Sequence, residues 1–75
     1  MFEQFLLDNG WKYISKCRCG GRNQRKYYNN AFPEYKIIHF TVSNTFSILK
    51  NYLRVTKKDE KAEDIEQILR EYGIV

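Results

Sequence analysis

Six basic side chains and no acidic ones lie between residues 9 and 33, and five aromatic residues are interleaved with them. Phosphates pair with cations and nucleobases stack on flat rings, so this composition is typical of a nucleic-acid surface. We therefore select candidate nucleic-acid-binding residues on a predicted hairpin in this segment: Lys16, Arg18, Arg22, Arg25, Lys26 and Tyr27.

A second interpretation of the same segment needs no ligand. Like charges facing each other across a turn at Gly20 and Gly21 would keep an exposed ribbon solvated and prevent it from pairing with neighbouring chains. The acidic segment 59–71 would also neutralise the hairpin if it lay nearby. The sequence leaves these alternatives open.

Three residues have side chains that ligate metals, namely Cys17, Cys19 and His39. A structural zinc site takes four ligands, usually with cysteines two to four residues apart, and this chain has neither that spacing nor a fourth Cys or His. On a strand the two cysteines share a face with Trp11 and Tyr13, where they pack as small hydrophobic side chains. A disulfide between them would be strained, which favours a reducing, cytoplasmic compartment. We expect no metal and no cofactor.

Catalytic chemistry finds little support in the sequence. His39 is the only histidine. General acid–base catalysis would need a second titratable residue beside it, and Glu34, Tyr35 and Lys36 are the nearest in sequence. The strands that carry the cysteines and His39 are separated in a meander, which disfavours a cysteine–histidine pair. No phosphate loop or nucleophile elbow is present, so we predict a protein without enzymatic activity.

The size and charge of the chain predict one small domain spanning residues 1–75. The chain carries a net charge of +4, a pI near 9.2 and 16% aromatic residues, which supply a core without disulfides. The N-terminus has an acid at Glu3 and only a short apolar run, unlike a signal peptide. No stretch approaches the roughly 20 apolar residues of a membrane span, so we expect no membrane partner.

Two segments show apolar residues at helical spacing. Phe2–Asn9 is predicted to be a short helix that ends at Gly10 in a left-handed cap, with Trp11 folding back on its last turn. The closing helix has the same device at Gly73, and acids between residues 59 and 64 are expected in its first turns. Its apolar stripe consists of Ile65, Ile68, Leu69 and Tyr72.

Between the helices the pattern changes to the period of two that is typical of strands. The best strand is Tyr35–Val42, rich in β-branched and aromatic residues. Further strands are expected at 11–19, 22–28, 45–49 and 53–55. The predicted class is α+β: a short N-terminal helix, an antiparallel meander of three to four strands, and a C-terminal helix, with the helices packed on one sheet face.

The layout is similar to that of the small HicA-type toxins, which share the double-stranded-RNA-binding-domain fold. The residues that carry the resemblance are 5–11, Arg25-Lys26-Tyr27 and the closing helix 65–73. Those toxins have a Gly-Ser/Thr-His turn with a catalytic histidine, where this chain has Cys19-Gly20-Gly21-Arg22. The resemblance therefore implies the fold without the catalytic residue, and Thr45–Lys58 is an addition to it.

Two functions are expected from these observations. The first is a small non-enzymatic domain that contacts nucleic acid through the basic hairpin. The alternative is a protein-interaction or homodimerising module, in which the acidic helix of one chain faces the basic hairpin of another. Its contact residues would be exposed aromatic side chains beside a sheet edge: Tyr27, Tyr28, Phe32 and Tyr35.

Overall fold

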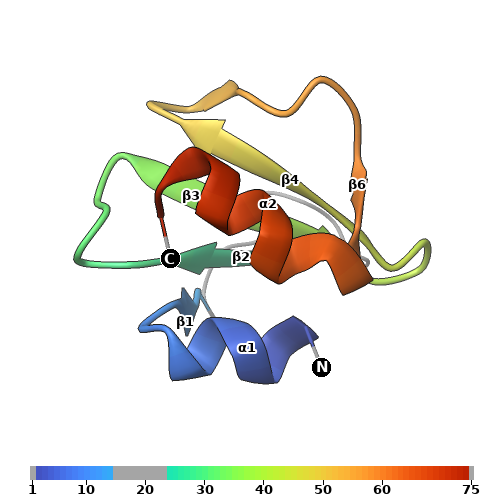
Figure 1. Ribbon diagram of the computed structural model, residues 1–75, viewed down its shortest axis with the longest axis horizontal. Helices are drawn as coiled ribbons and strands as arrows, with labels where there is room; N and C mark the ends of the chain where they lie inside the picture. Colours follow the sequence, from blue (N-terminus) through green and yellow to red (C-terminus); the bar gives the residue numbers. More distant parts are fainter. Residues whose placement is uncertain (1, 15–23, 75) are drawn as a thin grey trace.

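The computed structural model describes residues 2–14 and 24–74, and it consists of one antiparallel sheet between an N-terminal and a C-terminal helix (Figure 1). The predicted α+β class is confirmed. The elements, in chain order, are α1 (Phe2–Asp8), β1 (Lys12–Tyr13), β2 (Gln24–Tyr28), β3 (Tyr35–Phe40), β4 (Thr45–Lys50), β5 (Leu53–Arg54), β6 (Glu60–Lys61), a 3₁₀ turn (Ala62–Asp64) and α2 (Ile65–Tyr72).

The sheet is an antiparallel meander in the order β1-β2-β3-β4-β5, and β6 pairs with the start of β4. It has more strands than the three to four expected: the short β1 and β5 lie within the segments 11–19 and 53–55 that were expected to be strands, and β6 was not expected. With two residues, β6 is too short to show a periodicity of its own in the sequence. The strand expected over residues 35–42 ends at Phe40, before a turn in which Asn44 has a positive φ of 55°.

The acids placed by sequence in the first turns of the closing helix all lie before it, and Glu63 and Asp64 belong to the 3₁₀ turn. Glu60 belongs to β6, and α2 begins only at Ile65, after the 3₁₀ turn. Two contacts to the β3–β4 hairpin hold this segment in strand geometry: the Ser47 hydroxyl donates to the Asp59 carboxylate at 2.8 Å, and the Ala62 amide donates to the Asn44 carbonyl at 3.0 Å.

Both helices end in the predicted left-handed glycine, with φ of 89° at Gly10 and 70° at Gly73. After each glycine, the amide of the next residue reaches back to the helix. Trp11 donates to the Leu6 carbonyl at 2.9 Å, and Ile74 donates to the Leu69 carbonyl at 3.1 Å. This is the hydrogen-bond pattern of a Schellman cap. Trp11 and Ile74 are thereby turned into the core, where each is 1% exposed.

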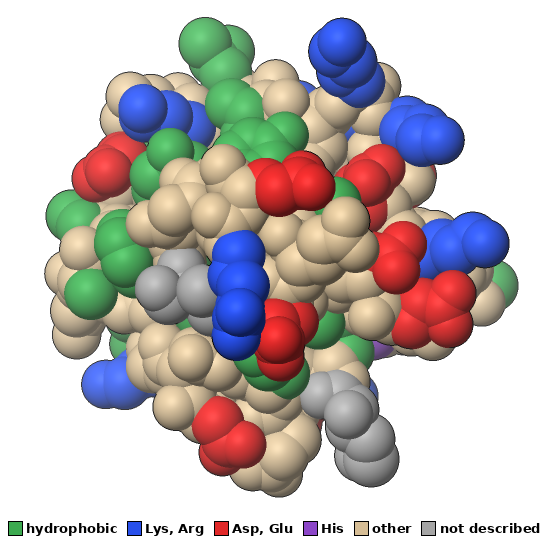
Figure 2. All heavy atoms as spheres, viewed as in Figure 1, with side chains coloured by type: hydrophobic (Ala, Val, Ile, Leu, Met, Phe, Trp, Pro, Cys, Tyr) green, Lys and Arg blue, Asp and Glu red, His purple; other side chains and the backbone are tan. Residues whose placement is uncertain are grey.

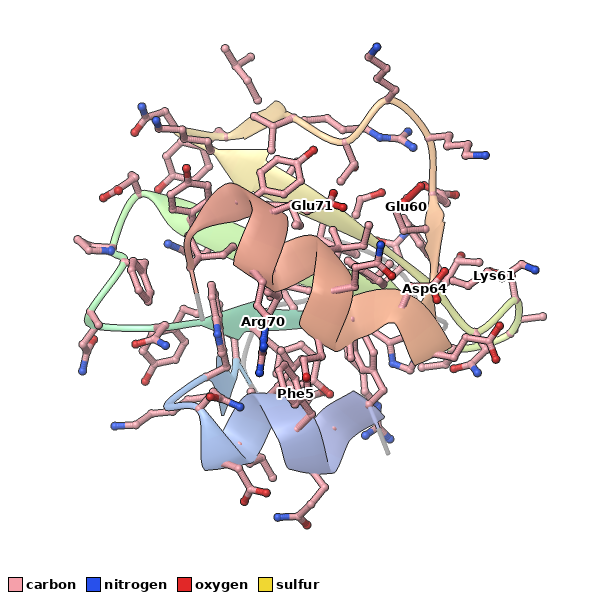
Figure 3. All side chains as sticks on the ribbon, viewed as in Figure 1. Phe5, Glu60, Lys61, Asp64, Arg70 and Glu71 are labelled. Carbon is pink, nitrogen blue, oxygen red and sulfur yellow. The ribbon has the colours of Figure 1, made fainter. Side chains whose placement is uncertain are left out.

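The core lies between the sheet and the two helices, all on one side of the sheet, as predicted. In Figure 1, α2 lies across the front of the sheet, and Figure 3 shows Phe5 of α1 in the space between the helices. One apolar cluster joins all three parts, and its members are Leu6, Trp11, Tyr27, Ile37, Phe46, Ile48, Ile65, Leu69 and Ile74.

Candidate nucleic-acid interface

The strand register divides the sheet into two faces. Residues directly opposite in an antiparallel pair point to the same side, and successive residues point to opposite sides. Tyr27, Ile37 and Ile48 form one row across β2, β3 and β4, and all three are fully buried under the helices. The residues on the other side of these strands form what we call the open face, because both helices lie on the opposite side of the sheet.

One row of the open face crosses five strands, and basic and apolar residues alternate along it. The register aligns, from β1 to β5, the residues Lys12, Tyr28, Lys36, Leu49 and Arg54. Neighbouring strands lie about 4.8 Å apart, so successive cations in this row are separated by about 10 Å with an apolar side chain between them. We call this set the cationic row.

Two further rows complete the open face, and each has one apolar residue, on β3, between polar residues. Lys26 lies opposite Ile38, which in turn lies opposite Ser47, and Phe40 lies between Gln24 and Thr45. Ile38 and Phe40 are half-buried, as are Tyr28 and Leu49 of the cationic row. The open face therefore combines partly exposed rings and aliphatic groups with lysines.

Carboxylates reach the open face at one edge. Asp59 accepts hydrogen bonds from the Ser47 hydroxyl and from Arg54 Nη2, each at 2.8 Å, and Arg54 Nε donates to the Thr56 carbonyl at 3.1 Å. Arg54 is therefore held in place and partly neutralised. Lys36 Nζ donates to the Pro33 carbonyl at 3.1 Å and keeps its charge.

Lys12, Lys26 and Lys36 are the cations of this surface that have no carboxylate partner among the described residues. The ion pairs among the described residues are Arg25–Glu3, Arg54–Asp59 and Arg70–Glu66, and none of them includes a lysine. A lysine without a protein counterion attracts an anion from solution more strongly than a paired one. The open face is thus available to a polyanion around Lys12, Lys26 and Lys36.

The structure divides the six residues selected from the sequence. Lys26 lies on the open face, whereas Arg25 and Tyr27 lie on the helix-covered face. The other three, Lys16, Arg18 and Arg22, lie outside the described residues, as do the glycines of the expected turn and both cysteines.

Tyr27 does not present a ring for stacking, which corrects the expectation drawn from the sequence. Its side chain is fully buried, and its hydroxyl donates to Glu3 Oε2 at 3.0 Å. The same carboxylate oxygen accepts a bond from Arg25 Nη1 at 2.9 Å, and the Arg25 guanidinium lies 5.7 Å from the centre of the Tyr13 ring. Burial, together with the bond to Glu3, raises the pKa of Tyr27 to about 12. These residues tie α1 to the sheet.

The other aromatic residues proposed as exposed contacts are largely engaged within the protein. The Phe32 ring stacks beside Trp11, with the ring centres 6.4 Å apart, and Lys50 Nζ lies 5.5 Å from the centre of the Tyr35 ring. Phe32, Tyr35 and Tyr28 are each half-buried. Of the four, Tyr28 is the one that the register places on the open face.

His39 lies on the helix-covered face and has the hydrogen-bond partner expected of a sheet histidine. Its Nε2 lies 3.0 Å from Asn44 Oδ1, and its ring stacks on Phe2 with the centres 4.2 Å apart. Within residues 2–14 and 24–74, no cluster of three or more His, Cys, Asp or Glu side chains is arranged to hold a metal ion.

Sequence reasoning named Tyr28 as an exposed aromatic contact but did not select Lys12, Lys36, Phe40 or Arg54 of the open face. The signal that exists is the alternation in β3, where Lys36, Ile38 and Phe40 share one side and Ile37 and His39 share the other. In β2 the adjacent tyrosines give no such signal, because either one would suit the core. Only the pairing of Tyr27 with Ile37 decides between them.

None of the helices in the described part of the chain has the length and apolar character needed to cross a lipid bilayer. The resemblance to HicA-type toxins stays a prediction. No protein-family model matches the chain, and neither a curated protein nor a solved structure is significantly similar to it.

Proposed function

We propose that this domain binds single-stranded nucleic acid across its open face, without catalysing a reaction. The observation that carries the proposal is the cationic row, in which Lys12 and Lys36 flank Tyr28 on the neighbouring strands. A single strand offers phosphates for the lysines and free base faces for the ring between them. Such contacts to backbone and base faces do not read sequence, so we expect little base preference.

A single strand fits this surface better than a duplex does. A duplex presents phosphates on its outside and keeps the faces of its bases stacked inside, so it could use the lysines but not Tyr28, Ile38 or Phe40. A splayed single strand uses both the lysines and the apolar residues.

We retain the cytoplasm as the predicted compartment, because a disulfide between Cys17 and Cys19 would be strained.

The first experiment measures binding of a fluorescein-labelled RNA of about 12 nucleotides by anisotropy over a series of salt concentrations. Each phosphate contact contributes about 0.7 to the slope of log K against log salt for a single strand. We expect the triple variant Lys12→Ala/Lys26→Ala/Lys36→Ala to bind more weakly, with the slope reduced by about 2.

A matched control removes the same charge from the helix-covered side and the loop beside it. The variant Lys57→Ala/Lys58→Ala/Arg70→Ala should keep the wild-type slope, because Lys57 and Lys58 line a hollow against α2 and Arg70 pairs with Glu66 on that helix. Equal loss in both variants would reduce the interaction to net charge and contradict a specific surface.

The alternative, a protein-binding or homodimerising module, is favoured by the half-buried Ile38, Phe40 and Leu49 on the same face. A symmetric dimer through this face would bring the lysines of two copies together, so high salt should promote it. Dimers in which an acidic helix meets a basic face should instead dissociate at high salt. Size-exclusion chromatography at low and high salt separates these cases, and a monomer at both removes them.

A further inference from the structure

The β4–β5 hairpin has an unusual residue at its tip. Lys50 pairs with Leu53, so the loop consists of Asn51 and Tyr52 alone, and their φ angles are 53° and 67°. A two-residue loop with positive φ at both positions is the pattern of a type I′ turn. Asn51 suits this geometry, whereas the second position strongly favours glycine.

Tyrosine at the second position is strained. A bulky side chain with φ in the left-handed region has its Cβ crowded against the backbone, which glycine avoids. Tyr52 therefore makes the hairpin less stable than a glycine would.

The fold gives no compensation for this strain. The Tyr52 side chain is 84% exposed and its neighbour Leu53 is 72% exposed. The hydrogen bonds, ion pairs and ring contacts within residues 2–14 and 24–74 do not involve the Tyr52 side chain. Strained residues that the surrounding packing does not explain are concentrated at functional sites.

The position of the tip indicates what Tyr52 contacts. The last pair of the hairpin on the open face is Leu49 with Arg54, which is the end of the cationic row, and Tyr52 follows directly beyond it. Arg54 is held by Asp59, and the register places Lys50 on the helix-covered face, where its Nζ lies 5.5 Å from the centre of the Tyr35 ring. The part of the tip that remains for a ligand is the protruding Tyr52 ring, and an exposed aromatic ring is a surface on which a base can stack.

We propose that Tyr52 stacks on a nucleobase at the β5 end of the single strand bound to the open face. This inference rests on the proposed function and extends it by one contact beyond the sheet. It also explains why a strained tyrosine stands where glycine would stabilise the fold: the ring serves the ligand rather than the core.

The test is a stability and binding measurement on Tyr52→Gly. Relief of the left-handed strain should raise the melting temperature, while loss of the stacked ring should weaken binding of the labelled RNA by about tenfold. Tyr52→Phe keeps the ring and should bind like the wild type. Val42→Gly is the control, since Val42 is 78% exposed in the turn at the opposite end of β4, and it should leave binding unchanged.

The outcomes separate this inference from the proposed function. If the wild type binds no single strand, both fail. If the lysine variant loses binding but Tyr52→Gly binds as tightly as the wild type, the open face stands and the role of Tyr52 is refuted. If Tyr52→Gly instead loses binding to vesicles containing anionic lipid while wild-type binding to RNA is absent, the tip is a membrane contact and the nucleic-acid assignment is overturned.

Discussion

The two faces of one sheet differ in almost every property, although the same strands build them. On the helix-covered face, Tyr27, Ile37 and Ile48 are fully buried in the core. The residues next to them in the chain, Tyr28, Lys36 and Leu49, lie on the open face and combine apolar groups with charge. Under the proposed function, stability and recognition depend on alternate residues, so a substitution on one face should change one property and leave the other unchanged.

The charges of the two sides differ as well. Figure 2 shows the helix-covered side, where acidic side chains lie over both helices. A hollow of about 600 Å³ between α1 and the start of α2 has an apolar lining that includes Phe2, Phe5 and Ile65, and its acidic residues are Glu3, Glu63 and Glu66. The acidic residues that line this hollow repel a polyanion, whereas the lysines of the open face attract one. This difference in charge favours the open face as the side that the proposed nucleic-acid ligand would contact.

The largest expected effect is on folding, at adjacent residues of β4. Ile48→Ala removes a fully buried side chain and should lower the free energy of unfolding by about 2–5 kcal/mol. Leu49→Ala, on the open face, should cost about 1 kcal/mol. Urea denaturation measures both. Similar losses at the two positions would mean that the open face is part of a core and not a free surface.

A smaller effect is expected from the buried tyrosine at alkaline pH. The pKa of Tyr27 is raised from 10.0 to about 12 in the folded protein, so its contribution to stability is complete below pH 10 and is lost as the pH rises toward 12. Two pKa units correspond to at most about 2.7 kcal/mol, and we expect about half, because the Glu3 carboxylate that accepts the hydrogen bond is exposed to solvent.

Denaturation of wild type and Tyr27→Phe at a series of pH values isolates this effect from the lysines, which titrate in the same range. The wild type should lose more stability than Tyr27→Phe between pH 10 and pH 12. Parallel pH profiles would show that the Tyr27 hydroxyl is not held in its neutral form by the fold.

The smallest expected effect distinguishes two neighbours in β2 that both carry one positive charge. Lys26→Ala should lower the salt slope of RNA binding by about 0.7, the contribution of one phosphate contact. Arg25→Ala should leave the slope unchanged, since Arg25 lies on the other face and pairs with Glu3. The reverse result would return the binding site to the helix-covered side.

Much of the fold was predictable because it depends on local signals. The helices follow from apolar residues three and four positions apart, and their ends follow from Gly10 and Gly73. The strands β2, β3 and β4 follow from their composition. The short β6 was not predictable, because a hydrogen bond between Ser47 and Asp59 and another between Ala62 and Asn44 determine it, and both join residues distant in sequence.

The candidate site was less predictable than the fold. A cluster of basic residues in the sequence shows how much charge a segment carries but not which way each side chain points. Arg25 and Lys26 look equivalent in the sequence and lie on opposite faces, and so do Tyr27 and Tyr28. Pairing across strands also brings Lys12, Lys36 and Arg54 into one row from segments that no local pattern connects.

The most direct test of the central claim follows the isoleucine methyl groups by NMR while single-stranded RNA is added. Ile37 and Ile38 are adjacent in β3 and point to opposite faces, and Ile48 shares the buried face with Ile37. Binding at the open face predicts that the Ile38 methyl resonances shift with RNA concentration while those of Ile37 and Ile48 stay in place. Shifts at Ile37 and Ile48 without a shift at Ile38, or no shift at any of the three, would contradict it.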